Sequence, residues 1–153
     1  MDHKIIEITK SSPETQVEAC IALLKEQMSF INARSDLKHV RKGVELGLEN
    51  PNVCKVFAAI NSDEKITAVA YGNIGCSLER AGYYLWINEL FVEPEERNKG
   101  IATSLLKYID KWCNENEIKG ISLVAEVSNH TAKLLYEKLH FLAGEVLIFD
   151  KNL

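Results

Sequence analysis

Several features that would narrow the function are missing from this 153-residue sequence. No apolar run reaches the ~18 residues that a membrane-spanning helix needs. The four cysteines, Cys20, Cys54, Cys76 and Cys113, form no CxxC pair and have no histidine at ligand spacing. This pattern argues against a zinc site, so we expect no bound metal and interpret the cysteines as small buried hydrophobic residues.

A strong positive charge is also missing, because the formal net charge is −4. Nucleic acid and anionic membranes attract basic proteins, so we expect neither as a partner. The opening residues, MDHKIIEITK, carry no secretory signal, and we therefore expect a cytoplasmic protein with reduced thiols. Repeats, low-complexity tracts and linkers are absent, which predicts a single domain over residues 1–153.

Hydrophobic periodicity predicts an alternation of strands and helices. The expected strands are 4–8, 54–60, 66–76, 83–92, 120–127 and 144–150. The first expected helix follows Ser12 as its N-cap, with Pro13 at its first position, and the second follows Ser35. Two further helices are expected over about 99–116 and 129–139. Hairpins and β-α-β units both occur in this order, so we expect an α/β fold with a mixed, largely antiparallel sheet and helices on both faces.

The strongest functional signal is PEERNKGIATSLL, residues 94–106, at a predicted strand-to-helix junction. A P-loop requires GxxxxGK[ST], but here Lys99 precedes Gly100, and the GxGxxG dinucleotide fingerprint is absent. What remains is Arg97-x-x-Gly100-x-Ala102. The first turn of a helix offers unpaired N–H groups to an anion, and a glycine lets a phosphate approach the backbone closely. A basic helix start with a flexible glycine is the alternative interpretation of these residues alone.

This loop resembles the Arg/Gln-x-x-Gly-x-Gly/Ala loop of the GNAT superfamily of N-acetyltransferases. Two further segments are similar to that family: VEPEER at 92–97, which leads into the loop, and NHTAKLLY at 129–136 followed by LHF at 139–141. The order of elements agrees along nearly the whole chain, whereas the motifs are specific from about residue 89 to 141. The resemblance implies the GNAT fold and acetyl-CoA as co-substrate.

The resemblance also assigns residues to acetyl-CoA. Backbone groups of the fourth predicted strand would pair with the pantetheine arm, and the loop would hold the pyrophosphate. Asn129 is equally well explained as the N-cap of the last helix. The residues so assigned are Leu90, Phe91, Val92, Arg97, Asn98, Lys99, Gly100, Ile101, Ala102, Thr103, Asn129 and Ala132.

Two residues are candidates for proton transfer. Tyr136 occupies the position of the family's tyrosine acid, although a tyrosine whose hydroxyl bonds to the backbone of the core is the alternative. Glu89 lies in an apolar stretch, where burial would raise its pKa and suit it as a base. Glu89 could instead face outward or form a salt bridge. If the strand contains a bulge, the alternation of side chains along it cannot show which face Glu89 occupies. His140 replaces a glycine usual in the family, so we expect a different turn there.

The implied function is transfer of an acetyl group from acetyl-CoA to a primary amine, by a homodimer. The acceptor would be a small molecule, such as an aminoglycoside, a polyamine or an amino acid, or a protein, and would enter near residues 30–36. The run ELFVEPEERNKGIATSLL, 89–106, is similar to the aminoglycoside 6′-N-acetyltransferases. A GNAT-like domain that senses acyl-CoA without turning it over is the alternative, and the tyrosine at 136 favours the enzyme.

Overall fold

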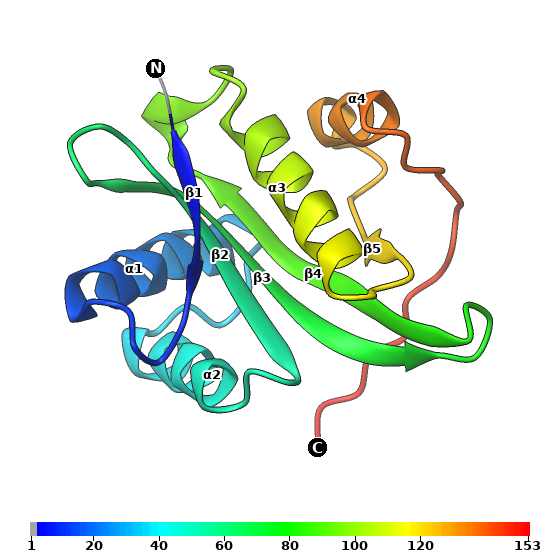
Figure 1. Ribbon diagram of the computed structural model, residues 1–153, viewed down its shortest axis with the longest axis horizontal. Helices are drawn as coiled ribbons and strands as arrows, with labels where there is room; N and C mark the ends of the chain where they lie inside the picture. The colour runs from blue at the N-terminus through cyan, green and yellow to red at the C-terminus, as the bar shows by residue number, and fades with distance from the viewer. Residues whose placement is uncertain (1–2) are drawn as a thin grey trace.

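A five-stranded sheet forms the centre of the computed structural model, which describes residues 3–153 (Figure 1). The strands are β1 (Lys4–Ile8), β2 (Cys54–Ile60), β3 (Ile66–Ser77), β4 (Gly82–Val92) and β5 (Ile121–Leu123). They follow one another in the sheet in chain order. The first four pair antiparallel and β5 pairs parallel to β4, which confirms the predicted mixed sheet.

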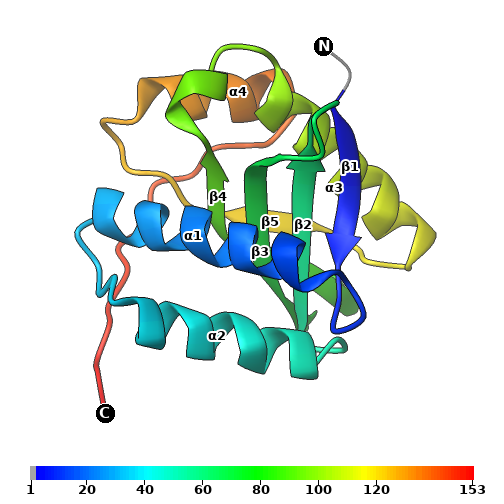
Figure 2. The same ribbon diagram turned by 90° about the vertical axis from the view of Figure 1, so that its left-hand side faces the viewer.

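Helices cover both faces of the sheet, as predicted. They are α1 (Glu14–Phe30), α2 (Leu37–Glu49), α3 (Ile101–Glu115) and α4 (His130–Lys138), with a short 3-10 turn at Pro94–Glu96. Figure 2 looks onto α1 and α2, with the sheet behind them and α3 beyond it. Among residues 3–153, none of these helices has the length and hydrophobicity of a membrane span.

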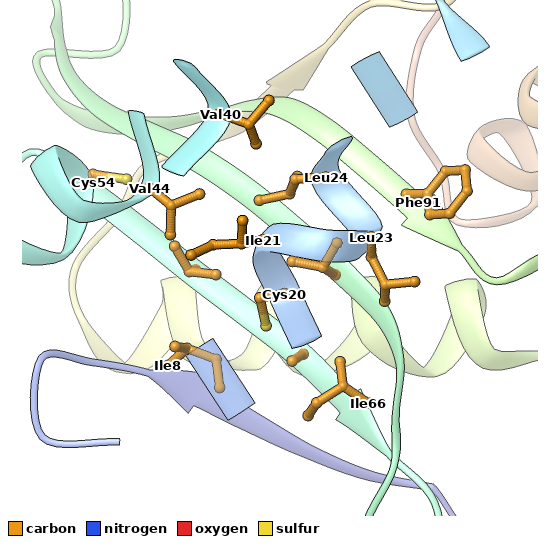
Figure 3. Close-up of a cluster of buried hydrophobic side chains, with 13 residues drawn as sticks. Ile8, Cys20, Ile21, Leu23, Leu24, Val40, Val44, Cys54, Ile66 and Phe91 are labelled. Atoms are coloured by element: carbon orange, nitrogen blue, oxygen red, sulfur yellow. The ribbon is translucent and has the colours of Figure 1, made fainter. Parts of the chain in front are cut away.

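Two hydrophobic clusters, one on each face, hold the layers together. In the first, α1 directs Cys20, Ile21 and Leu24 against the sheet (Figure 3). In the second, buried residues of α3 pack on the opposite face. Burial raises the pKa of Cys20 to about 12, so this thiol stays neutral and behaves as a small hydrophobic group. Cys54 and Cys113 are buried as well, but Cys76 is exposed, so the prediction of four buried cysteines is wrong at one position.

The first helix begins one residue later than predicted. Pro13 is its N-cap rather than its first helical residue, because its ψ of 137° is extended. The Ser12 hydroxyl does not cap the helix and instead accepts a hydrogen bond from the Thr9 N–H at 2.9 Å. The second helix was expected after Ser35 and begins at Leu37, with Asp36 as its N-cap, whose side chain accepts from the His39 N–H at 3.0 Å.

Two predicted strands at the C-terminal end differ from the structure. β5 is limited to Ile121–Leu123 instead of 120–127, and residues 144–150 form no strand. A strand requires a neighbouring strand as well as a suitable sequence, because its backbone N–H and C=O groups must be paired. β5 has such a neighbour on one side, and residues 144–150 have none among the residues that the structure describes.

The C-terminus of α4 contradicts the expectation of a different turn at His140. This residue adopts the left-handed conformation, with φ of 65°, that a glycine would favour. Its N–H donates to Glu137 O at 3.0 Å, and the Phe141 N–H donates to Tyr136 O at 3.0 Å. These two bonds define a Schellman turn, which satisfies the last carbonyls of the helix. The turn is therefore the usual one, made by a residue with a Cβ.

Replacing His140 with Gly is expected to stabilise the fold by about 1 kcal/mol, because the left-handed conformation is strained for a residue with a Cβ. Chemical unfolding of the two proteins measures the difference. His140→Ala is the matched control, since it removes the imidazole but keeps the Cβ. Equal gains from both variants would show that the imidazole, rather than the backbone strain, sets the cost.

Candidate active site

A β-bulge interrupts β4 at the position where the sequence left the orientation of Glu89 open. Tyr71 of β3 lies opposite Glu89, whereas the next residue, Gly72, lies opposite Ile87. Asn88 is therefore the extra residue of the bulge. Beyond such a bulge, the odd-numbered and even-numbered residues of the strand exchange the faces of the sheet to which their side chains point.

The reversal turns Glu89 toward α1. Before the bulge, Leu85 and Ile87 pack in the cluster under α3, and after it Leu90 and Val92 do so. Glu89 therefore points to the other face, where its carboxylate accepts a hydrogen bond from Gln27 Nε2 of α1 at 3.1 Å. The outward-facing alternative for this residue is thereby ruled out.

The surroundings of Glu89 favour its neutral form. Burial raises the pKa of Glu89 above its usual value, and the hydrogen bond from Gln27 partly offsets this effect. Within residues 3–153, Glu89 makes no ion pair, so the salt-bridge alternative finds no support in the structure. A carboxylate with a raised pKa, held by one amide, is a candidate for a general base.

β4 loses its neighbour beside the bulge. Its pairing with β5 runs from Leu85–Ile121 to Ile87–Leu123 and ends there, while β4 continues to Val92. Over this last part, the described residues provide no strand on the β5 side of β4. Backbone groups of Leu90–Val92 thus have no strand partner on that side, and Val92 O accepts a hydrogen bond from Arg97 Nε instead.

The N-terminus of α3 presents uncapped N–H groups beside open space. Gly100 is the N-cap with φ of 79°, and no side chain caps the helix. The first intrahelical bond runs from the Ser104 N–H to Gly100 O at 3.0 Å, which leaves the N–H groups of Ile101–Thr103 without helical partners. A Cβ at Gly100 would meet no atom within 4 Å, so open space adjoins the backbone here. No acidic residue lies in the first turn to repel an anion.

Arg97 extends toward α1 and not toward the N-terminus of α3. Its Nε donates to Val92 O at 3.0 Å. Its guanidinium carbon lies 5.3 Å from the ring centre of Phe91 and 5.8 Å from that of Phe30, within cation–π range of both. The structure therefore places Arg97 between β4 and the end of α1.

The other loop residues surround the helix start without converging on it. Lys99 Nζ lies 3.1 Å from a carboxylate oxygen of Glu96, in an exposed ion pair of small energetic weight. Asn98 is exposed with φ of 63°, a conformation that asparagine tolerates. Ile101 is buried, so only its backbone can face a ligand, whereas Thr103 is partly exposed in the first turn.

An open pocket of about 400 Å³ lies beside Arg97. It combines aromatic and charged groups from the end of α1 and the end of β4. The residues that line it are Lys25, Glu26, Ser29, Phe30, Phe91, Pro94 and Arg97. A volume in the range of small-molecule sites, close to the helix side of β4, suits the binding of a small acceptor.

Tyr136 lies on the α3 side of the sheet, opposite to the face that holds Glu89. It packs against the second cluster, and its ring centre is 5.8 Å from that of Phe141. Burial raises the pKa of Tyr136, so the hydroxyl keeps its proton at neutral pH. This hydroxyl makes no hydrogen bond to any other residue between 3 and 153, unlike the backbone-bonded tyrosine that the alternative interpretation requires.

Asn129 acts as the N-cap of α4. Its side-chain oxygen accepts a hydrogen bond from the Ala132 N–H at 3.1 Å. The capping interpretation of Asn129 is confirmed. The bond also ties Ala132 into the first turn, which fixes the start of the helix that carries Tyr136.

One residue beside Glu89, Gln27, was missed in the sequence. Gln27 follows Leu24 by three residues and Cys20 by seven, so it lies on the buried stripe of α1. A polar side chain on an apolar stripe is a detectable signal for a buried polar partner. Phe30 begins the segment, residues 30–36, near which we expected the acceptor to enter, and it lines the pocket, but its contact with Arg97 could not be seen in the sequence.

Comparisons with known proteins agree with this architecture. Residues 18–141 match the acetyltransferase (GNAT) family. The uncharacterized N-acetyltransferase YhfO of Bacillus subtilis (strain 168) is 29% identical over 126 residues, covering 82% of this chain and 83% of YhfO. Streptothricin acetyltransferase A of the same organism is 35% identical over 63 residues, which cover 41% of this chain and only 36% of that protein.

A solved structure shares the fold at low sequence identity. The aminoglycoside N-acetyltransferase AAC(6′)-Iy in complex with CoA superposes with a TM-score of 0.81 at 18% identity, covering 99% of this chain and 95% of that one. The mixed sheet, the helices on both faces and the match to most of the chain lead to one assignment. The chain belongs to the acetyltransferase (GNAT) family.

Proposed function

We propose that this acetyltransferase moves an acetyl group from acetyl-CoA to a primary amine of a small molecule. One observation carries the proposal: β4 separates a partly buried carboxylate on one face from a half-buried, unbonded tyrosine hydroxyl on the other. Glu89 lies on the stretch of β4 that has no neighbouring strand on the β5 side, and Tyr136 packs on the opposite face of the sheet. A base and an acid on opposite faces of a sheet with an open strand edge suit an acyl transfer between two substrates.

The α3 N-terminus is proposed to bind the pyrophosphate of acetyl-CoA. The N–H groups of Ile101–Thr103, left without helical partners, and the open space beside Gly100 support this assignment. Asn98 and Lys99 would line the same loop. Leu90–Val92 would pair with the pantetheine arm through the backbone, and Asn129 and Ala132 would border it from α4.

Arg97 is proposed to act differently from the expectation that it binds the pyrophosphate directly. Its hydrogen bond to Val92 O and its contacts with Phe30 and Phe91 tie the loop to β4 and α1. In this arrangement it positions the loop and contributes positive charge nearby. It also forms one wall of the pocket in which we place the acceptor.

The chemistry requires that the acceptor nitrogen lose two protons and that the thiolate gain one. Glu89 would accept the first proton from the ammonium, directly or through water, because a neutral amine is needed to attack the thioester. The new amide bond forms as the carbon–sulfur bond breaks, Tyr136 would protonate the departing thiolate, and the second proton of the nitrogen would pass through water to restore the Tyr136 hydroxyl. A free thiol has a pKa of about 8.5, so a proton donor assists its departure near neutral pH.

A small cationic molecule is the favoured acceptor. Glu26 in the pocket wall offers negative charge to an amine, and the rings of Phe30 and Phe91 offer apolar contact. The sequence similarity to streptothricin acetyltransferases supports a small cationic amine as the acceptor. The fold shared with the aminoglycoside acetyltransferase supports the same choice. Membership of an acetyltransferase family argues against the sensor alternative.

The proposal is tested by release of free CoA thiol from acetyl-CoA in the presence of a panel of amines. Aminoglycosides, a streptothricin, polyamines, amino acids and a lysine peptide represent the possible acceptors. Amine-dependent thiol release, with an acetylated small-molecule product detected by mass spectrometry, is expected. Acetylation of the peptide alone would overturn the choice of a small molecule, and binding of acetyl-CoA without turnover would favour the sensor.

Gly100→Val is expected to weaken acetyl-CoA binding at least ~10-fold, which corresponds to about 1.4 kcal/mol. The added side chain would occupy the space beside the helix N–H groups, and valine is strained at the φ of 79° that Gly100 adopts. Calorimetric titration with acetyl-CoA measures the loss.

Gly100→Asn separates these two causes, because asparagine tolerates the left-handed conformation but still adds a side chain. Weakened binding by both variants would point to direct obstruction. Unchanged affinity in a folded Gly100→Val protein would refute the pyrophosphate site.

A further inference from the structure

His3 is a buried ionisable side chain that the proposed chemistry does not use. Its side chain is only 5% exposed, and its Nε2 atom makes no hydrogen bond to any residue between 3 and 153. A buried polar atom without a partner is costly, so it calls for an explanation beyond packing. Figures 1 and 2 show the start of β1 at the same end of the sheet as the turn before α3. His3 therefore lies at the end of the sheet where we place the pyrophosphate.

Glu96 links His3 to the loop that begins α3. His3 Nε2 lies 3.9 Å from Glu96 Oε2, and Lys99 Nζ lies 3.1 Å from the same oxygen. The first distance is too long for a hydrogen bond, whereas Lys99 donates one to this oxygen. One carboxylate oxygen thus faces two groups that can carry positive charge, and it bonds to only one of them.

Lys65 is another cation near Glu96, but it is already paired. Its Nζ bonds to Glu93 Oε1 at 2.7 Å. This bond is the main reason that the pKa of Lys65 is raised, and the nearby charges of Glu95 and Glu96 contribute as well. Since Lys65 bonds to Glu93, the cation that bonds to Glu96 is Lys99.

The remaining surroundings of His3 offer no second carboxylate. Lys4, the next residue along β1, is exposed and positively charged. The first turn of α3, residues 101–104, has no charged side chain. Within residues 3–153, Glu96 is the one carboxylate that lies within 4 Å of the imidazole nitrogens. A proton on His3 therefore depends on the charge of Glu96.

The ion pair between Lys99 and Glu96 disfavours a proton on His3. A buried imidazolium needs a compensating negative charge. While the Lys99 ammonium lies against Glu96, it cancels much of that negative charge and repels a second cation. If Lys99 moved away, the Glu96 carboxylate would face the imidazole uncompensated and would favour its protonation. Histidine suits this exchange, because the imidazole is the side chain that ordinarily changes charge close to neutral pH.

A diphosphate would draw Lys99 away from Glu96. The Lys99 side chain is 43% exposed, and it precedes Gly100, the N-cap of α3. An exposed ion pair is weak and easily exchanged. Two phosphate charges held by the N–H groups of a helix N-terminus attract an ammonium more strongly than one carboxylate does. Binding of the coenzyme at α3 and protonation of His3 are thereby coupled through one oxygen of Glu96.

We propose that His3 is a positioning residue for the coenzyme loop, which takes up a proton from solvent when acetyl-CoA draws Lys99 away from Glu96. The imidazolium then replaces Lys99 as the partner of the carboxylate, so the turn before α3 stays tied to β1. This inference rests on the proposed function, because it requires Lys99 to contact the pyrophosphate. The complex binds more protons than the free protein, so the affinity for acetyl-CoA should increase as the pH falls.

An NMR titration of the histidine rings without coenzyme is the first test. Lys99→Met removes the competing ammonium, so the ratio of protonated to neutral His3 at a fixed pH should rise at least ~3-fold. His3→Gln identifies the signal, and the ring of exposed His39 should titrate as before. Lys111→Met is the matched control, because it removes a lysine from an exposed ion pair near the other end of α3. An unchanged His3 titration in Lys99→Met would overturn the coupling.

Calorimetric titration with acetyl-CoA is the second test, in buffers that differ in their enthalpy of ionisation. The native protein is expected to take up as much as about one proton more than His3→Gln, and comparison of the two cancels protons exchanged by the coenzyme itself. From pH 8 to pH 6, its affinity should rise up to ~10-fold more than that of the variant. Equal proton uptake by both would overturn the role of His3.

The two tests separate this inference from the proposed function. The ring titration uses no coenzyme, so it examines the exchange at Glu96 by itself. Binding of acetyl-CoA with equal proton uptake by native protein and His3→Gln would reject the proton exchange and leave the pyrophosphate site in place. Failure of the native protein to bind acetyl-CoA would refute the pyrophosphate site, and the role of His3 would be refuted with it.

Discussion

Tyr136→Phe is expected to lower the turnover number by about 10²–10⁴-fold, the usual contribution of a positioned general acid. The hydroxyl makes no hydrogen bond within residues 3–153, so its removal breaks no structural contact. The ring and its contact with Phe141 remain. The effect should therefore fall on turnover rather than on stability or on acetyl-CoA affinity, because protonation of the thiolate occurs in the transition state.

Steady-state kinetics on the best amine, with a thermal melt beside it, provide the measurement. Tyr83→Phe is the matched control, because Tyr83 is 55% exposed on β4 and makes no contribution to the site. A Tyr136→Phe enzyme with full activity would mean that water or another group protonates the thiolate. Loss of both stability and activity would contradict the catalytic role and favour a structural one.

The central part of the fold was predictable because it depends on local sequence. The hydrophobic pattern located β1 and β2 at the correct residues, since each strand is bounded by polar segments and has a neighbour in the sheet. The loop before α3 was predictable for a similar reason. Glycine at position 100 and the apolar stripe of α3 are local features, and they put the predicted helix start, about residue 99, within two residues of the observed start at Ile101.

The parts that were not predictable depend on contacts between distant residues. The alternation of side chains along β4 could not show which face of the sheet Glu89 occupies, because the bulge at Asn88 is visible only in the pairing with β3. The position of Arg97 depends on Phe30, which is 67 residues earlier in the chain. Residues 144–150 have a clear strand pattern but form no strand, because no strand among residues 3–153 pairs with them.

Glu89→Gln is expected to reduce the rate at neutral pH by a factor of about 10²–10⁴, because the amide cannot accept a proton from the ammonium. The deficit should shrink at high pH, where the amine is already neutral. In the native enzyme, the active carboxylate is lost as the pH falls through the raised pKa of Glu89. The variant should therefore lack this acidic limb. Exposed Glu79 provides the matched control, Glu79→Gln, with a native pH–rate profile.

Stability should change in the opposite sense to activity. A carboxyl whose pKa is higher in the folded state than in the unfolded state favours folding when it is protonated. This contribution is complete below the unfolded value near 4.5 and is lost as the pH rises through the raised folded pKa. Glu89→Gln cannot ionise, so it should be more stable than the native protein at neutral pH and gain nothing in acid. Urea unfolding at both pH values measures the difference.

Gln27→Leu completes the argument about the base, because Gln27 is the one described residue that hydrogen-bonds to Glu89. That bond lowers the pKa of Glu89 against the effect of burial. Its removal should raise the pKa further and shift the acidic limb of the pH–rate profile to higher pH, with the maximal rate nearly retained. A structural role for Glu89 would give no such shift. An unchanged limb in Gln27→Leu, together with a normal profile in Glu89→Gln, would assign the proton transfer to another group.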